Sequence, residues 1–265
     1  MTFGDATAIE GEDGRYSAEV QDGWGLAGVT NGGYLMAMAG RAMAAETRGR
    51  HLVSITGHFM NPANPGAVSI EVEQLKSGSR YTTARATMSA GTKILLSVTG
   101  SLAEPSSIAT DAAVVRGSPP DLPPPEECQR AESSENSLFP PPLVDRIDMR
   151  LHPADAAALA GEPSGVAEMR GWWRLLDDES IDPFAIVLAV DSFPPAVFNM
   201  NLPMSWTPTL DLTVHVRDPG PHVWLMCRTQ TRFVTGGFLE EDAEVWDDQG
   251  NLVALSRQLA LVGRG

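Results

Sequence analysis

Asp211 is the residue of this sequence best placed for acid–base chemistry, because it interrupts a stretch with the alternation of a β-strand. In the predicted strand 206–217, alternate apolar residues share one face, and Asp211 lies on the other with Thr209, Thr213 and His215. Aspartate is disfavoured in the middle of a strand, and a partly buried carboxylate must be paired or hydrogen-bonded. Asp211 is therefore a candidate general base for water, and an aspartate bonded to a neighbour is the alternative.

Gln258 is the second candidate, and it lies in the predicted strand 252–262. It shares a face with three small residues, Ala254, Ser256 and Ala260, which would leave room for a ligand. A side-chain amide offers both a donor and an acceptor, so Gln258 could orient an attacking water beside Asp211. A glutamine that faces solvent is the simpler alternative.

A hydroxyl could complete a polar triad with these two side chains. Thr229 and Thr231 share one face of the predicted strand 223–232, and Thr231 is preferred. Both threonines also fit an ordinary structural role, because threonine is a common strand former.

The segment Asn31-Gly32-Gly33 opens a predicted helix, 34–46, that has no charge before Arg41. Glycine allows close approach of a ligand, and the free N–H groups at a helix start carry the positive end of the helix dipole. These three residues are candidates for binding a developing oxyanion. The alternative is a tight turn that simply requires glycine.

Two segments of the chain show the same order of predicted elements, each with one apolar helix followed by four strands. The first has strand 15–20, helix 34–46 and strands 51–60, 67–76, 81–89 and 93–103. The second has strand 166–175, helix 184–190 and strands 206–217, 223–232, 238–246 and 252–262. Asp182-Pro183 is a typical helix start for the second helix.

Short sequence matches in register indicate an internal repeat. His58-Phe59-Met60-Asn61-Pro62 matches His215-Val216-Arg217-Asp218-Pro219, and Ser101-Leu102-Ala103 matches Gln258-Leu259-Ala260, both at an offset of 157 residues. This offset sets Ser54 against Asp211 and Ser101 against Gln258. The second half alone would then have a competent site.

A sheet that must cover so apolar a helix has to curl around it, and this arrangement is the hotdog fold. The sequence therefore predicts an α+β double hotdog, in which two antiparallel sheets, each wrapped around a long central helix, are joined into one continuous sheet. A single hotdog leaves one edge of its sheet exposed, and pairing two copies side by side covers these edges. The predicted divisions are a first half at 1–104, a Pro-rich linker at 105–145 and a second half at 146–265.

Composition excludes several classes of function. The 34 acidic and 19 basic side chains give a net charge of −15, which disfavours nucleic acid or an anionic membrane as a partner. Two distant cysteines, Cys128 and Cys227, and five scattered histidines suggest neither a disulfide framework nor a metal site. No signal peptide or membrane span is expected, so the predicted location is the cytoplasm.

The ordered motifs resemble the bacterial acyl-CoA thioesterase II family. Thr209 to Arg217, Trp224-Leu225 and Asp248 to Ala254 leading to Gln258 resemble its C-terminal half, and Asn31 to Tyr34, His58 to Pro62 and Pro65-Gly66 resemble its N-terminal half. This resemblance implies a cofactor-free hydrolase of acyl-CoA, in which an Asp, a Thr or Ser, and a Gln activate water. Asp211 and Gln258 would be the first and last of these.

Two alternatives remain open at this stage. One is a catalytically silent binding protein for acyl-CoA or an acyl carrier, and the other is a hotdog enoyl-CoA hydratase using Asp211 and His215. The hydratase is the weaker hypothesis, because residues four apart on a straight strand lie about 13 Å from each other. Asp211 and His215 would then be too far apart to act on one substrate atom. Association of the chain into a homo-oligomer, such as a dimer of double hotdogs, is also open.

Overall fold

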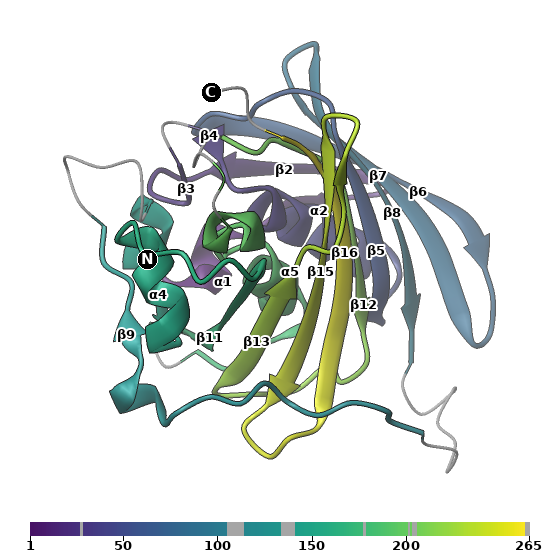
Figure 1. The fold of residues 1–265 in the computed structure, drawn as a ribbon. Coiled ribbons are helices and arrows are strands. Elements are labelled where there is room, and N and C mark those ends of the chain that lie inside the picture. Colours follow the sequence, from purple (N-terminus) through teal and green to yellow (C-terminus); the bar gives the residue numbers. More distant parts are fainter. Residues whose placement is uncertain are drawn as a thin grey trace.

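The computed structural model describes residues 1–26, 29–104, 114–133, 141–176, 179–200, 202 and 206–262. Its main element is a 14-stranded sheet that curves around two helices, α2 (Gly32–Glu46) and α5 (Pro183–Val190), as Figure 1 shows. The two helices pack against each other inside the curve. The predicted α+β class and the wrapping of a sheet around apolar helices are confirmed.

The order of strands in the sheet is symmetric about its centre. On one side lie β5 (His51–Phe59), β8 (Lys93–Ala103), β7 (Tyr81–Ala90), β6 (Gly66–Ser77), β2 (Arg15–Val20) and β1 (Glu10–Glu12). On the other lie β12 (Thr209–Val216), β16 (Leu252–Leu261), β15 (Phe238–Asp247), β13 (Leu225–Gln230), β11 (Glu168–Leu175), β10 (Ile147–Leu151) and β9 (Gln129–Arg130). The ten strands expected from sequence are all present within a few residues of their predicted ends.

The centre of the sheet is the antiparallel pair β5 and β12. Thr56 and Thr213 are direct partners, and their hydroxyl oxygens lie 3.0 Å apart. These residues are 157 positions apart, which is the offset of the sequence repeat. A residue that pairs with its own repeat equivalent lies on the axis relating the two copies, so the register of the sheet agrees with the repeat.

Both helices are buried because their surfaces are almost entirely apolar. Tyr34, Met36, Met38 and Met43 of α2 are fully buried, as are Ile186 and Leu188 of α5. The start of α5 follows its sequence signature, since the Asp182 carboxylate accepts hydrogen bonds from the N–H groups of Phe184 and Ala185. Each helix therefore begins at a capped residue and runs inside the sheet.

Part of the Pro-rich segment is more structured than a free linker. Within 114–133 and 141–145, η1 (Pro125–Glu127) leads to β9, which pairs with β10, and η2 (Pro142–Asp145) precedes β10. The indole N–H of Trp172 on β11 also donates to Pro123 O at 2.8 Å. The rest of the predicted linker, 105–113 and 134–140, lies outside the described residues.

Several small elements were not predicted. They include β1, β10, α1 (Phe3–Ala6), α4 (Pro153–Leu159), η3 (Ala196–Asn199), the ribbon of β3 (Gly25–Leu26) and β4 (Val29–Thr30), and β14 (Val234–Thr235), which pairs with β15. Cys128 and Cys227 are buried free thiols. Of the helices in the described ranges, none combines the length and apolar character that crossing a membrane requires.

Candidate active site

A cavity of about 360 Å³ lies where the start of α2, the end of α5, the end of β5 and the start of β12 meet. Its apolar wall includes Leu35, Phe59, Leu143, Met149, Leu159 and Phe193, and its polar groups include Asn31, Asp191, Thr209 and Gln258. An apolar cavity with a few convergent polar groups is the usual form of a small-molecule site. Both halves of the chain contribute to it.

Asn31 is the N-cap of α2 and also connects the two halves. Its Oδ1 accepts from the Tyr34 N–H at 2.9 Å, which satisfies one free donor of the helix start. Its Nδ2 donates to the backbone oxygen of Asp191 at 2.8 Å and to Asp191 Oδ2 at 2.9 Å. The N-terminal end of α2 is thereby joined to the C-terminal end of α5.

The glycines after Asn31 allow this close approach of α2 and α5. A Cβ on Gly33 would lie 2.6 Å from Val187 O, so only glycine fits there without a shift of the backbone. The Gly33 N–H donates to Asp191 Oδ2 at 2.8 Å. The predicted anion site at this helix start therefore holds a carboxylate of the chain itself, and Asn31 and Gly32 line the cavity beside it.

Asp191 has the electrostatics expected of a general base. Burial raises its pKa to about 6, although hydrogen bonds from Gly33, Asn31 and Gly32 act in the opposite direction. The carboxylate lines the cavity, where a bound molecule could reach it. A carboxylate whose pKa lies near neutrality can both take a proton and return it, which is the requirement for general acid–base work.

Gln258 is held between two side chains on its own face of the sheet. Its Oε1 accepts from Thr209 Oγ1 at 3.3 Å, and its Nε2 donates to Glu241 Oε1 at 3.0 Å. Both Gln258 and Thr209 line the cavity. The structure therefore brings Gln258 to the same cavity as Asp191.

The expectation that Asp211 and Gln258 converge is wrong. Gln258 is the partner of Leu212, which faces the helices and is 1% exposed, whereas Asp211 pairs with Leu259 and His58 on the opposite face. A β-bulge between Thr209 and Asp211 is the reason, because the extra residue turns Thr209 inward. Thr209, which was predicted to share the face of Asp211, instead contacts Gln258.

Thr229 and Thr231 lie away from the cavity wall. Thr229 is 1% exposed and pairs with Ala243 of β15, which separates β13 from β16. Thr231 is 7% exposed, and its N–H donates to Ala167 O. Neither hydroxyl has a hydrogen-bond partner among the described residues. The hydroxyl that contacts Gln258 belongs to Thr209.

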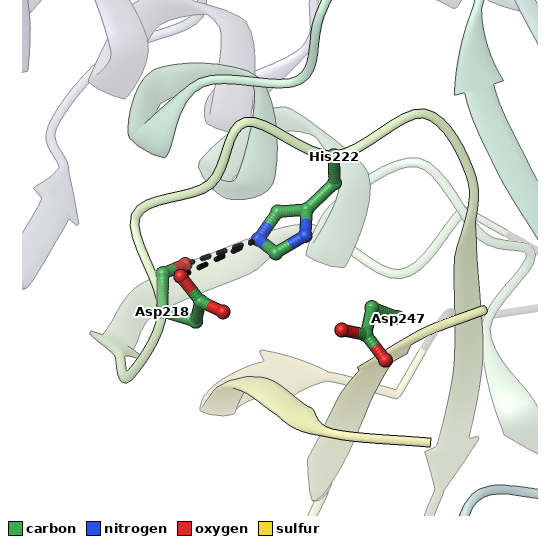
Figure 2. Close-up of side chains that lie close together, drawn as sticks. All are labelled: Asp218, His222 and Asp247. Carbon is green, nitrogen blue, oxygen red and sulfur yellow. Dashed lines mark hydrogen bonds and ion pairs between the residues drawn. The ribbon is translucent and has the colours of Figure 1, made fainter. Parts of the chain in front are cut away.

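The described residues also include one cluster with possible metal-ligand geometry, Asp218, His222 and Asp247 (Figure 2), whose donor atoms all lie within 4.8 Å of one another. Local contacts already account for these side chains. The Asp247 carboxylate accepts from Gln249 and Asn251, and His222 Nε2 lies 3.3 Å from the backbone oxygen of Asp218. Asp218 and His222 follow the end of β12 opposite to Thr209, and none of the three residues lines the cavity.

Comparisons with known proteins identify the family of the chain. A family model for the acyl-CoA thioesterase N-terminal domain matches residues 20–103, and one for the acyl-CoA thioesterase C-terminal domain matches residues 121–262. No curated protein matches the sequence significantly.

Several solved structures are similar to this chain. A chain from Thermobifida fusca YX assigned as a thioesterase II is 34% identical, with a TM-score of 0.86, and covers 100% of this chain and 98% of its own. A hot dog-fold protein of unknown function from Alicyclobacillus acidocaldarius has a TM-score of 0.87 at 20% identity, covering 99% and 98%. An acyl-CoA thioesterase II from Mycobacterium marinum has a TM-score of 0.70 at 17% identity, covering 100% and 97%. The fold is of the hotdog type, and the chain belongs to the acyl-CoA thioesterase family.

Proposed function

We propose that this acyl-CoA thioesterase hydrolyses fatty acyl-CoA with Asp191, not Asp211, as the base that activates water. The observation that carries the proposal is the meeting of Asp191, Thr209 and Gln258 at one mostly apolar cavity, where the pKa of Asp191 is raised to about 6. The resemblance to the family implies a working set of Asp, Thr or Ser, and Gln. These three residue types line this cavity, and Asp211 does not.

The chemistry needs one base and one group that orients the reactants. Asp191 takes a proton from water as the water oxygen attacks the thioester carbonyl carbon, and no covalent bond to the enzyme forms. The C–S bond then breaks, and the proton passes from Asp191 to the departing sulfur, giving free acid and CoA. The apolar wall, which includes Leu35, Phe59 and Met149, suits an acyl chain.

Gln258 and Thr209 would orient the water and the carbonyl. One Gln258 N–H is engaged by Glu241, and Thr209 holds the amide oxygen, so the second N–H is available to a carbonyl oxygen in the cavity. Because the Gly33 N–H is bonded to Asp191, we assign stabilisation of the oxyanion mainly to Gln258. Asn31 and Gly32 would position Asp191 and the substrate.

We also propose that the chain is a duplicated hotdog with one working site. The strand order, the Thr56–Thr213 pair and the repeat offset support the duplication. The two places where the helices meet also differ, since the N-cap of α2, Asn31, contacts Asp191, whereas the N-cap of α5, Asp182, is paired with a base, Arg41, at 3.0 Å. Ser101 stands where the repeat has Gln258, so the first half lacks both the acid and the amide.

The test is release of thiol from a panel of acyl-CoA esters by the parent protein and by Asp191→Asn. We expect the variant to lose about 10²–10³-fold in kcat while it still binds acyl-CoA, because asparagine cannot accept the proton. A folded parent that binds the esters without releasing thiol would instead indicate the silent binding protein. Full activity of Asp191→Asn would refute the proposed base.

A further inference from the structure

Glu241 is an inward-facing acid in an otherwise outward-facing acidic run. On β15, Glu240, Asp242 and Glu244 lie on the outer face, and two of them form ion pairs there, Asp242 with Arg257 and Glu244 with Arg228. Glu241 is directed the other way and is 5% exposed. A carboxylate is rarely left in such a place without a specific partner, because desolvation is costly.

The partners of Glu241 belong to the wall of the cavity. Its Oε1 accepts from Gln258 Nε2 at 3.0 Å, and its Oε2 accepts from the Ala196 N–H at the start of η3. Ala196 follows Pro194 and Pro195, which line the cavity, as Gln258 does. Glu241 itself lies behind this wall, so it contacts the residues of the site and not the space for the substrate.

We propose that ionised Glu241 positions Gln258 for thioester hydrolysis by fixing which way its amide points. An ionised carboxylate can only accept hydrogen bonds, so it must face the Gln258 NH₂ group and not the amide oxygen. The amide oxygen is then directed to Thr209, and the remaining N–H is left for the substrate carbonyl. This inference rests on the proposed role of Gln258.

The ionisation of Glu241 would therefore be linked to activity. Burial raises its pKa to about 7, the negative charges of Asp191 and Asp242 act in the same direction, and the bonds from Ala196 and Gln258 oppose them. On the other elements that contact it, β16 presents the neutral Gln258 and η3 presents a backbone N–H. A protonated Glu241 could donate to the amide oxygen and reverse the Gln258 amide, which would turn its N–H groups away from the substrate.

The test uses the full chain and an acyl-CoA ester, with Glu241→Gln, Gln258→Ala and the double variant. We expect Glu241→Gln to lower kcat about 10-fold with KM within about 2-fold, because glutamine no longer dictates the amide orientation. In the Gln258→Ala background, the same substitution should change kcat less than about 2-fold. Glu240→Gln, on the outer face of the same strand, is the matched control and should behave as the parent.

The pH profile gives a second readout that a purely structural role would not change. The acid limb of kcat in the parent should contain two ionisations, from Asp191 and Glu241, and in Glu241→Gln only one. If Glu241→Gln does not fold, the pH profiles of the parent and Gln258→Ala are compared instead. The acid limb of the residual activity of Gln258→Ala should then contain one ionisation.

Two results would overturn the inference. Glu241→Gln with parental kcat would do so, and so would an equal loss in the parent and in the Gln258→Ala background, which would indicate a structural role. Parental activity of Gln258→Ala would be a different failure, since it removes Gln258 from the proposed mechanism and the inference with it.

Discussion

Asn31 Nδ2 donates a hydrogen bond to Asp191 Oδ2 at 2.9 Å, across 160 residues of sequence. This contact places a carboxylate at the N-terminal end of α2, where the helix dipole favours negative charge. The same carboxylate lies at the C-terminal end of α5, where the dipole disfavours it. The two halves of the chain together create the environment of Asp191, and neither helix would do so alone.

Asp211→Asn should keep the activity of the parent within about 3-fold, since its side chain lies on the opposite face of the sheet from Gln258 and outside the cavity wall. The measurement is kcat/KM for thiol release, with Asp191→Asn assayed beside it. A loss for Asp211→Asn as large as that for Asp191→Asn would contradict the placement of the base at the end of α5.

Asn31→Ala should weaken catalysis in a pH-dependent way. The variant loses a hydrogen bond that lowers the pKa of Asp191, so that pKa should rise above about 6. Because the base must be ionised, activity falls as the pH drops through this pKa, and the acid limb of the profile should move to higher pH. Loss of the N-cap should also cost about 1 kcal/mol of stability.

The measurement is a set of pH–rate profiles for the parent and Asn31→Ala, with chemical denaturation to follow stability. Thr2→Ala is a useful control, because Thr2 caps α1, far in sequence from the site. An acid limb of Asn31→Ala that coincides with that of the parent would show that Asn31 caps α2 without tuning Asp191.

The two central helices and ten of the strands were predictable from sequence because each has a local signature. The period-2 strands, the uncharged helix after Asn31-Gly32-Gly33 and the Asp182-Pro183 start all reflect local backbone and burial preferences. The repeat offset was read from the sequence as well, and the Thr56–Thr213 pair is consistent with it. Gln258 was singled out because small residues flank it on its own face, and the structure places it at the cavity.

The acid of the proposed site could not be identified from sequence, because its position depends on non-local geometry. Strict alternation set Thr209 beside Asp211, and the β-bulge that separates them has no glycine or proline to mark it. Asp191 reaches the cavity only through the pairing of α2 with α5. One signal was available, since an aspartate that ends an uncharged helix opposes the dipole, which suggests a role other than stability.

The two inward-facing acids should make the protein more stable in mild acid than in mild base. Burial raises the pKa of Asp191 to about 6 and that of Glu241 to about 7, so both groups bind protons more tightly in the folded chain. A raised pKa of an acid gives stability that is present at low pH and is lost as the pH rises through the folded value.

We therefore expect the free energy of unfolding to be about 2 kcal/mol larger near pH 5.5 than near pH 8. Asp148, Asp242 and Asp247 have lowered pKa values. The stability that their ionised carboxylates contribute to the protein is therefore lost only in stronger acid, outside this pH window. Urea unfolding at the two pH values measures the difference, and Asp191→Asn combined with Glu241→Gln should abolish most of it. A parent that is more stable near pH 8 would show that these carboxylates are better solvated than their contacts indicate.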